Sequence, residues 1–104
     1  MANVKELTMQ SFETEVLKGK EGESVLVDFW APWCGPCRMQ GPVIDKLAAA
    51  GYNVAKVNID EQPDLAERYR VMTIPTLMVF KGGEVQQQFV GVQSQKTLEG
   101  ALNG

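Results

Sequence analysis

The sequence predicts one α/β domain across residues 1–104, with a mixed β-sheet covered by helices on both faces. Its 104 residues, 44% of them hydrophobic, suffice for one core and are too few for two typical domains. Ser24–Trp30 is almost continuously apolar, which is typical of a central strand buried on both faces. Gly82-Gly83 separates two later apolar runs and indicates an antiparallel hairpin, because glycine readily takes positive φ.

The first part of the chain predicts two strands separated by a helix. Val4–Leu7 is a short strand candidate, and Ser24–Trp30 is the buried strand. Thr8 has the side chain of a helix N-cap, and Gly19 is expected to end that helix. The apolar side chains that share one face of this helix are Phe12, Val16 and Leu17.

A second helix is predicted to follow the two cysteines and to stop at Gly51. Pro36 suits its first turn, where the missing N–H has no intrahelical partner. Pro42 lies in its interior, where it removes one hydrogen bond and is expected to kink the helix. The apolar residues at helical spacing are Met39, Val43, Ile44, Leu47 and Ala48.

The second half of the chain predicts three more strands and two helices. Val54–Ile59 is an internal strand, and Pro63 begins a short helix. Thr76–Phe80 and Val85–Val90 are the strands of the hairpin, and Ser94 is expected to cap the last helix. The inward side chains of these two helices are Leu65, Ala66 and Tyr69, followed by Leu98, Ala101 and Leu102.

Composition excludes several classes of function. Ten basic and 13 acidic residues give a net charge of -3, so we expect no nucleic-acid partner. The absence of histidine excludes Ser-His and Cys-His catalysis and any histidine metal site. The first twenty residues contain charges and no apolar signal-peptide core, and the apolar stretch Val71–Phe80 is too short to cross a bilayer. We therefore expect a cytoplasmic protein that does not associate with membranes.

The two cysteines, Cys34 and Cys37, lie where the buried strand turns into the second helix, and three interpretations compete. A zinc site needs three or four protein ligands, and this chain offers two cysteines and no histidine. A structural disulfide would constrain a single turn, and so short a loop adds only about 2 kcal/mol of stability. The third interpretation is dithiol–disulfide exchange, which suits a C-x-x-C pair in a strand–helix–strand context.

Exchange chemistry agrees best with the position of the pair. Free N–H groups at a helix N-terminus stabilise a thiolate, and Cys34 lies at that terminus. Cys37 lies one turn later, where it can attack a mixed disulfide formed at Cys34. We therefore expect Cys34 to be the attacking thiolate and Cys37 the resolving thiol, with no cofactor and no metal.

Trp30–Cys37 reads WAPWCGPC, which is similar to the active-site signature of the thioredoxin family. The resemblance covers essentially the whole length of the chain. Gln40 and Gly41 depart from the family pattern, and a glycine beside a proline predicts a more mobile helix. Further matches are Asp28, Pro42, Lys56, Ile74-Pro75-Thr76, Phe80-Lys81-Gly82-Gly83 and Gly91.

The resemblance implies a thioredoxin fold and a protein-disulfide reductase. In this fold the first, third, second, fourth and fifth strands lie side by side in that order, the last two form an antiparallel hairpin, and four helices flank the sheet. The expected partners are a thioredoxin reductase and disulfide-containing client proteins, with the chain acting as a monomer. The alternatives are a disulfide isomerase or oxidase, and a redox-independent binding subunit that uses only the apolar surface.

Asp28 is the only ionisable residue between Val25 and Trp33, and burial in such a run raises the pKa of a carboxyl group. From the residues alone, Asp28 either accepts a proton or caps the next turn. The resemblance implies that it accepts the proton of Cys37. Lys56 resembles the family lysine that modulates this acid, and the alternative is an ordinary lysine whose ammonium group reaches solvent.

The resemblance also implies a substrate-binding surface around Cys34. Pro75 is expected to follow a cis peptide bond, and an extended client segment is expected to pair with the backbone from Thr73 to Pro75. Asp60 is expected to hold the indole N–H of Trp33. The full predicted set is Trp33, Gly35, Pro36, Ile59, Asp60, Thr73, Ile74, Pro75, Gly91 and Val92.

Overall fold

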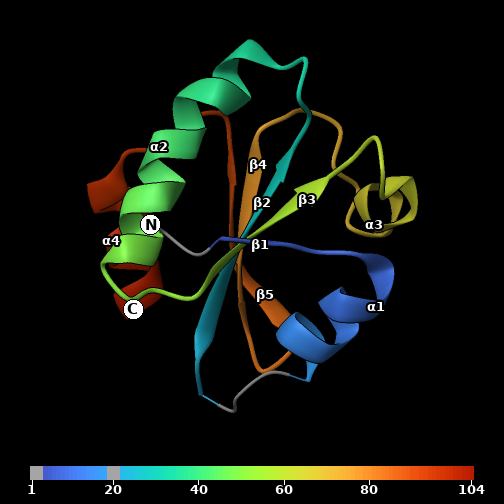
Figure 1. Ribbon diagram of the computed structural model, residues 1–104. Coiled ribbons are helices and arrows are strands. Elements are labelled where there is room, and N and C mark those ends of the chain that lie inside the picture. The colour runs from blue at the N-terminus through green and yellow to red at the C-terminus, as the bar shows by residue number, and fades with distance from the viewer. Residues whose placement is uncertain (1–3, 19–21) are drawn as a thin grey trace.

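The computed structural model describes residues 4–18 and 22–104, and within them five strands form one mixed sheet (Figure 1). The strands are β1 (Lys5–Glu6), β2 (Ser24–Trp30), β3 (Val54–Asn58), β4 (Thr76–Lys81) and β5 (Glu84–Val90). Their order in the sheet is β1-β3-β2-β4-β5, as the resemblance implied. β1, β3 and β2 are parallel, whereas β4 is antiparallel to both β2 and β5.

Helices cover both faces of this sheet, as the sequence predicts. They are α1 (Met9–Phe12), a π-helical turn (Glu13–Leu17), α2 (Gly35–Ala49), α3 (Pro63–Arg68) and α4 (Gln95–Asn103). Figure 1 shows α2 and α4 on one side of the sheet and α1 and α3 on the other. Among the described residues, none of these helices has the length and apolar content that crossing a bilayer requires.

The first helix differs from a regular α-helix in its second half. Thr8 caps it as predicted, because its hydroxyl oxygen accepts the N–H of Ser11 at 3.2 Å. Further on, the N–H of Lys18 donates to the carbonyl oxygen of Glu13 at 2.9 Å, five residues back. This wider turn accommodates one additional residue within the helix. Gly19, which was expected to end it, lies outside the described residues.

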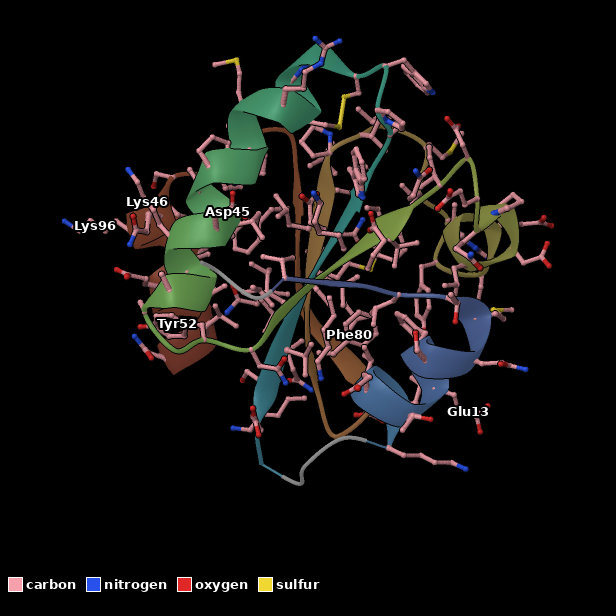
Figure 2. All side chains as sticks on the ribbon, in the orientation of Figure 1. Glu13, Asp45, Lys46, Tyr52, Phe80 and Lys96 are labelled. Atoms are coloured by element: carbon pink, nitrogen blue, oxygen red, sulfur yellow. A yellow bond between two sulfur atoms is a disulfide. The ribbon has the colours of Figure 1, made fainter. Side chains whose placement is uncertain are left out.

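The side chains of β2 alternate between two cores. Its odd-numbered residues from 25 to 29 face α1 and α3, where Phe12 and Phe80 also pack. The rings of Phe12 and Phe80 meet edge to face, with centroids 5.6 Å apart, and Figure 2 labels Phe80 in this layer. On the opposite face, Leu26 packs against residues of α2 and α4. Asp28 shares that face with Leu26, because successive strand residues alternate.

α2 begins and ends as the sequence predicts. Cys34 is its N-cap, and Pro36 lies in its first turn. After the last turn, Gly51 takes a φ of +95°, a left-handed conformation that favours glycine. The N–H groups of Gly51 and Tyr52 then donate to carbonyl groups of that turn and satisfy them. The helix runs without interruption through Pro42.

The buried stripe of α2 differs from the predicted one at its first position. Spacing assigned Met39 to the apolar face, but its side chain is 69% exposed. The buried residues are instead Cys37, Gln40, Ile44 and Leu47. These positions follow one another at intervals of three or four residues, which is the helical period. Residue 40 rather than residue 39 therefore faces the sheet, and a polar side chain occupies a core position.

The hairpin between β4 and β5 closes as predicted. Gly82 and Gly83 have φ values of +62° and +80°, and the flanking residues Lys81 and Glu84 pair across the turn. A Cβ atom at Gly83 would lie 2.9 Å from the carbonyl oxygen of Leu17. Glycine at position 83 is therefore required both by the backbone conformation and by this close approach.

Two strands are shorter than predicted. Of the expected strand Val4–Leu7, only the pair Lys5–Glu6 belongs to the sheet. β3 ends at Asn58 rather than at Ile59, because the side-chain oxygen of Asn58 accepts the N–H of Asp60 at 2.9 Å and turns the chain. This turn places Asp60 close to the end of β2, where the functional residues gather.

Candidate redox-active site

A disulfide joins Cys34 to Cys37 where the chain passes from β2 into α2. The two Cα atoms are 5.3 Å apart, and both side chains are buried. The main-chain N–H of Cys37 donates to the Sγ atom of Cys34 at 3.2 Å. In Figure 2 the two sulfur atoms appear as a yellow bond at the N-terminal end of α2. The first sulfur therefore lies where the unpaired N–H groups of the helix converge.

Ile74 and Pro75 approach the disulfide from the segment that precedes β4. The peptide bond between them is cis, as predicted. The Sγ atom of Cys34 lies 3.7 Å from the carbonyl oxygen of Ile74. Ile74 and Ile59 are partly buried and pack against the small apolar cluster that contains both cysteines. The disulfide is thus bordered by apolar side chains from two separate segments.

Trp33 forms the exposed border next to Cys34. Its side chain is 64% exposed, and its indole N–H donates to Oδ2 of Asp60 at 2.9 Å. The contact that the resemblance implied is therefore present. Because the Asn58 side chain fixes the turn that carries Asp60, the orientation of the Trp33 ring depends on the end of β3.

The remaining predicted substrate-binding residues lie on three segments. Gly35 and Pro36 are exposed in the first turn of α2, and Thr73 is exposed just before Ile74. Gly91, which follows β5, donates its N–H to the carbonyl oxygen of Pro75 at 2.8 Å. Val92 is 42% exposed beside it. The segment before β4 therefore contacts both of the others, because Pro75 accepts the N–H of Gly91 and Ile74 lies against Cys34, the neighbour of Gly35. The role of these residues in substrate binding stays a prediction.

Asp28 is a buried carboxyl group in the middle of β2. Its side chain is 1% exposed, and neither carboxyl oxygen accepts a hydrogen bond from the described residues. Burial raises the pKa of Asp28 from 3.8 to about 7, while the positive charge of Lys56 opposes this shift and the negative charge of Glu6 adds to it. The predicted direction is confirmed. The alternative in which Asp28 caps the next turn is wrong, because the group accepts no hydrogen bond there.

Lys56 pairs with Asp28 in the register of the parallel strands β2 and β3. Its Nζ atom lies 4.2 Å from the centroid of the Trp30 ring, a cation–π geometry. The indole N–H of Trp30 in turn donates to Oε2 of Glu6 at 3.1 Å. Lys56 is partly buried and lies against an aromatic ring, and its role as the lysine that modulates Asp28 stays a prediction.

Sequence reasoning missed Glu6 and the exposure of Met39, which it placed on the buried face of the second helix. Glu6 reaches Trp30 only because β1 lies beside β3, a placement that no local pattern reveals. Met39 and Met72 are 69% and 94% exposed, on α2 and on the segment before Thr73. An exposed methionine beside a reactive pair was the available signal, because flexible thioether side chains suit adaptable binding surfaces.

Comparison with known proteins agrees with this geometry. The family model described as Thioredoxin matches residues 3–104. The chain belongs to the thioredoxin family. It is 45% identical to a thioredoxin of Porphyra purpurea over 97% of this chain and 95% of that protein. It is 46% identical to thioredoxin 1 of a Nostoc species over 98% of this chain and 96% of that protein. A crystal structure of a Malassezia sympodialis thioredoxin superimposes with a TM-score of 0.83 at 30% identity, covering 99% and 90% of the two chains.

Membership of the thioredoxin family makes this chain a protein-disulfide oxidoreductase. The Cys34–Cys37 pair supplies the redox couple, of which the structure contains the oxidised, disulfide form. The chemistry is dithiol–disulfide exchange, in which sulfur atoms change partners and two electrons pass between the pair and a second disulfide. The Cys34–Cys37 bond is accordingly the oxidised form of a redox couple and not only a structural disulfide that constrains one turn of the chain.

Proposed function

We propose that this protein reduces disulfide bonds in client proteins and is returned to its dithiol form by a thioredoxin reductase. The observation that carries the proposal is the position of the Cys34 sulfur at the N-cap of α2, bordered by the exposed Trp33 ring. Gly35 and Pro36 favour reduction over oxidation, because no histidine lies between the cysteines to stabilise the reduced thiolate strongly. The protein works in the cytoplasm as a monomer.

The first step is attack by the Cys34 thiolate on a client disulfide. The N–H of Cys37 and the N-terminal peptide groups of α2 stabilise the anion before the attack. A bond forms between Cys34 Sγ and one client sulfur, while the client S–S bond breaks. The second client sulfur leaves as a thiolate and takes a proton from solvent.

The second step is release of the client by Cys37. Its thiol loses a proton to the Asp28 carboxylate through an intervening water molecule, and the resulting thiolate attacks Cys34 Sγ. The Cys34–Cys37 disulfide forms, the mixed disulfide breaks, and the first client sulfur leaves as a thiolate that is then protonated. The client gains two electrons from the cysteine pair and two protons from solvent, while Cys37 releases its proton to Asp28 and Cys34 released its own when it ionised.

Asp28 suits this second step because of where it lies and how it titrates. It shares a face of the sheet with Leu26, which α2 covers, and Cys37 is buried in the first turn of that helix, as its partner Cys34 is at the N-cap. A pKa of about 7 leaves a substantial fraction of Asp28 deprotonated at neutral pH, so the group can accept a proton there. Lys56 favours the charged, accepting form.

Client segments bind in extended form across the border of the disulfide. Trp33, Ile74 and Val92 supply the apolar contacts. The backbone from Thr73 to Pro75 supplies hydrogen bonds that depend little on the amino-acid sequence of the client. Broad client specificity follows, because main-chain contacts are common to all polypeptides.

The test is reduction of insulin disulfides with NADPH- or ferredoxin-linked thioredoxin reductases supplied in turn. The wild-type protein is expected to turn over with at least one of them. Cys34→Ser abolishes turnover, whereas Cys37→Ser accumulates a mixed disulfide between Cys34 and the client, detectable by mass spectrometry. A Cys34→Ser/Cys37→Ser protein that supports full function in cells would instead favour the redox-independent binding subunit.

A further inference from the structure

A buried amide links α2 to the loop that follows β5. Gln40 lies one turn after Cys37, and its side chain is fully buried. Its Oε1 atom accepts the main-chain N–H of Gln93 at 2.6 Å, and its Nε2 atom donates to the carbonyl oxygen of Gln93 at 3.1 Å. One side chain thus pairs with both polar groups of one backbone residue, as a neighbouring strand would.

This pairing explains why a glutamine is stable at a core position. A buried amide is costly unless its donor and acceptor are both satisfied, and here Gln93 satisfies both. An apolar side chain of the same length would fill the space without that requirement. What the amide adds is a fixed position for the backbone of Gln93 relative to α2, because hydrogen bonds are directional and apolar contacts are not.

The loop from Gly91 to Gln93 is held at both ends. At one end, the N–H of Gly91 donates to the carbonyl oxygen of Pro75 at 2.8 Å. At the other end, Gln40 holds Gln93, and the side chain of Gln93 also donates back to the carbonyl oxygen of Gly91 at 3.3 Å. Val92 lies between the two attachments and is 42% exposed. The loop is therefore fixed both to the cis-proline segment and to the helix that carries Cys37.

We propose that Gln40 is a positioning residue that holds Val92 in place for client binding. This inference rests on the proposed function, since it assigns Val92 to the client surface. Without the amide, the loop keeps its attachment to Pro75 and loses its attachment to α2. Client binding must then order the loop, so the KM for protein disulfides rises. The sulfur chemistry at Cys34 is unchanged, because Gln40 makes no hydrogen bond to either cysteine.

The decisive variant is Gln40→Met, which keeps the length and helix propensity of the side chain and removes both hydrogen bonds. With insulin as the disulfide, we expect the KM to rise roughly threefold to tenfold while kcat changes little. With cystamine, a small disulfide that carries no polypeptide segment to bind along the loop, we expect a rate constant unchanged within about twofold. Gln10→Met, the same replacement at an exposed position of α1, is the matched control and leaves both values unchanged.

Amide hydrogen exchange tests the same link without relying on activity, and its wild-type measurement does not depend on a variant that folds. In the wild-type protein the Gln93 amide is expected to exchange slowly, and in Gln40→Met it exchanges much faster. An unprotected Gln93 amide in the wild type overturns the inference, and so does a variant that loses stability but keeps the wild-type KM for insulin. Failure of the wild-type protein to reduce insulin would count against the proposed function, while the exchange measurement would still decide the link.

Discussion

Replacing Asp28 by asparagine is expected to change how the stability of the oxidised protein depends on pH. The pKa of Asp28 is about 7 in the folded protein and 3.8 when it is unperturbed, so the folded state holds this proton more tightly than the unfolded chain. The corresponding stabilisation is fully present below pH about 4 and is lost as the pH rises through about 7. The difference between the two pKa values corresponds to about 4 kcal/mol. No reduction for solvent screening is needed, because the side chain is 1% exposed.

The assay is denaturant unfolding of the oxidised protein, followed by tryptophan fluorescence between pH 4 and pH 9. The free energy of unfolding of Asp28→Asn minus that of the wild type is expected to increase by about 4 kcal/mol across this range, because asparagine does not titrate. Asp45→Asn, which removes the same charge from an exposed position of α2, is the control and keeps the wild-type pH dependence. A difference between Asp28→Asn and wild type that stays constant within about 1 kcal/mol would refute the assignment of a buried, titrating carboxyl group.

At pH 7, Asp28→Asn should slow the resolution of a preformed mixed disulfide by about a hundredfold, because the proton acceptor for Cys37 is lost. Stopped-flow release of a labelled peptide thiol measures this rate, and an unchanged rate would show that Asp28 is not the proton acceptor. Glu6→Gln should lower the pKa of Asp28, because the negative charge of Glu6 raises that pKa. Carbon NMR titration of the Asp28 carboxyl group measures the pKa, and an unchanged or raised value in the variant would contradict the prediction. Gly83→Ala should destabilise the fold by about 2 kcal/mol or more in denaturant unfolding, because of its φ of +80° and the adjacent carbonyl oxygen. Gly100→Ala in α4, where the Cβ meets open space, should instead raise stability by about 0.5 to 1 kcal/mol, and equal effects of the two replacements would disprove the strain argument.

Much of the site could be predicted because its parts are local. Cys34 and Cys37 are one helical turn apart, so a helix start between them fixes their relation without reference to the rest of the chain. The direction of the Asp28 pKa shift follows from the apolar neighbours that surround it along β2. The hairpin turn at Gly82 and Gly83 is decided by backbone conformations that glycine alone adopts readily.

The parts that escaped prediction depend on segments that are distant along the chain. Gln40 meets Gln93 across 53 residues, and Glu6 meets Trp30 across 24. Met39 was assigned to the wrong face because an apolar residue next to a buried position resembles a core residue in the sequence. Only the packed helix shows that the polar neighbour is the one facing inward.

The sequence by itself determined the succession of strands and helices along the chain, the reactive cysteine pair at the start of a helix and the buried acid in the strand before it. These follow from the period of apolar residues and from backbone preferences that act within a few residues. Only the tertiary structure decided which groups surround the acid and what fixes the loop at Val92. The physical reason is that such contacts form when the sheet and its helices pack, and their partners are set by the arrangement of whole elements rather than by neighbours in the chain.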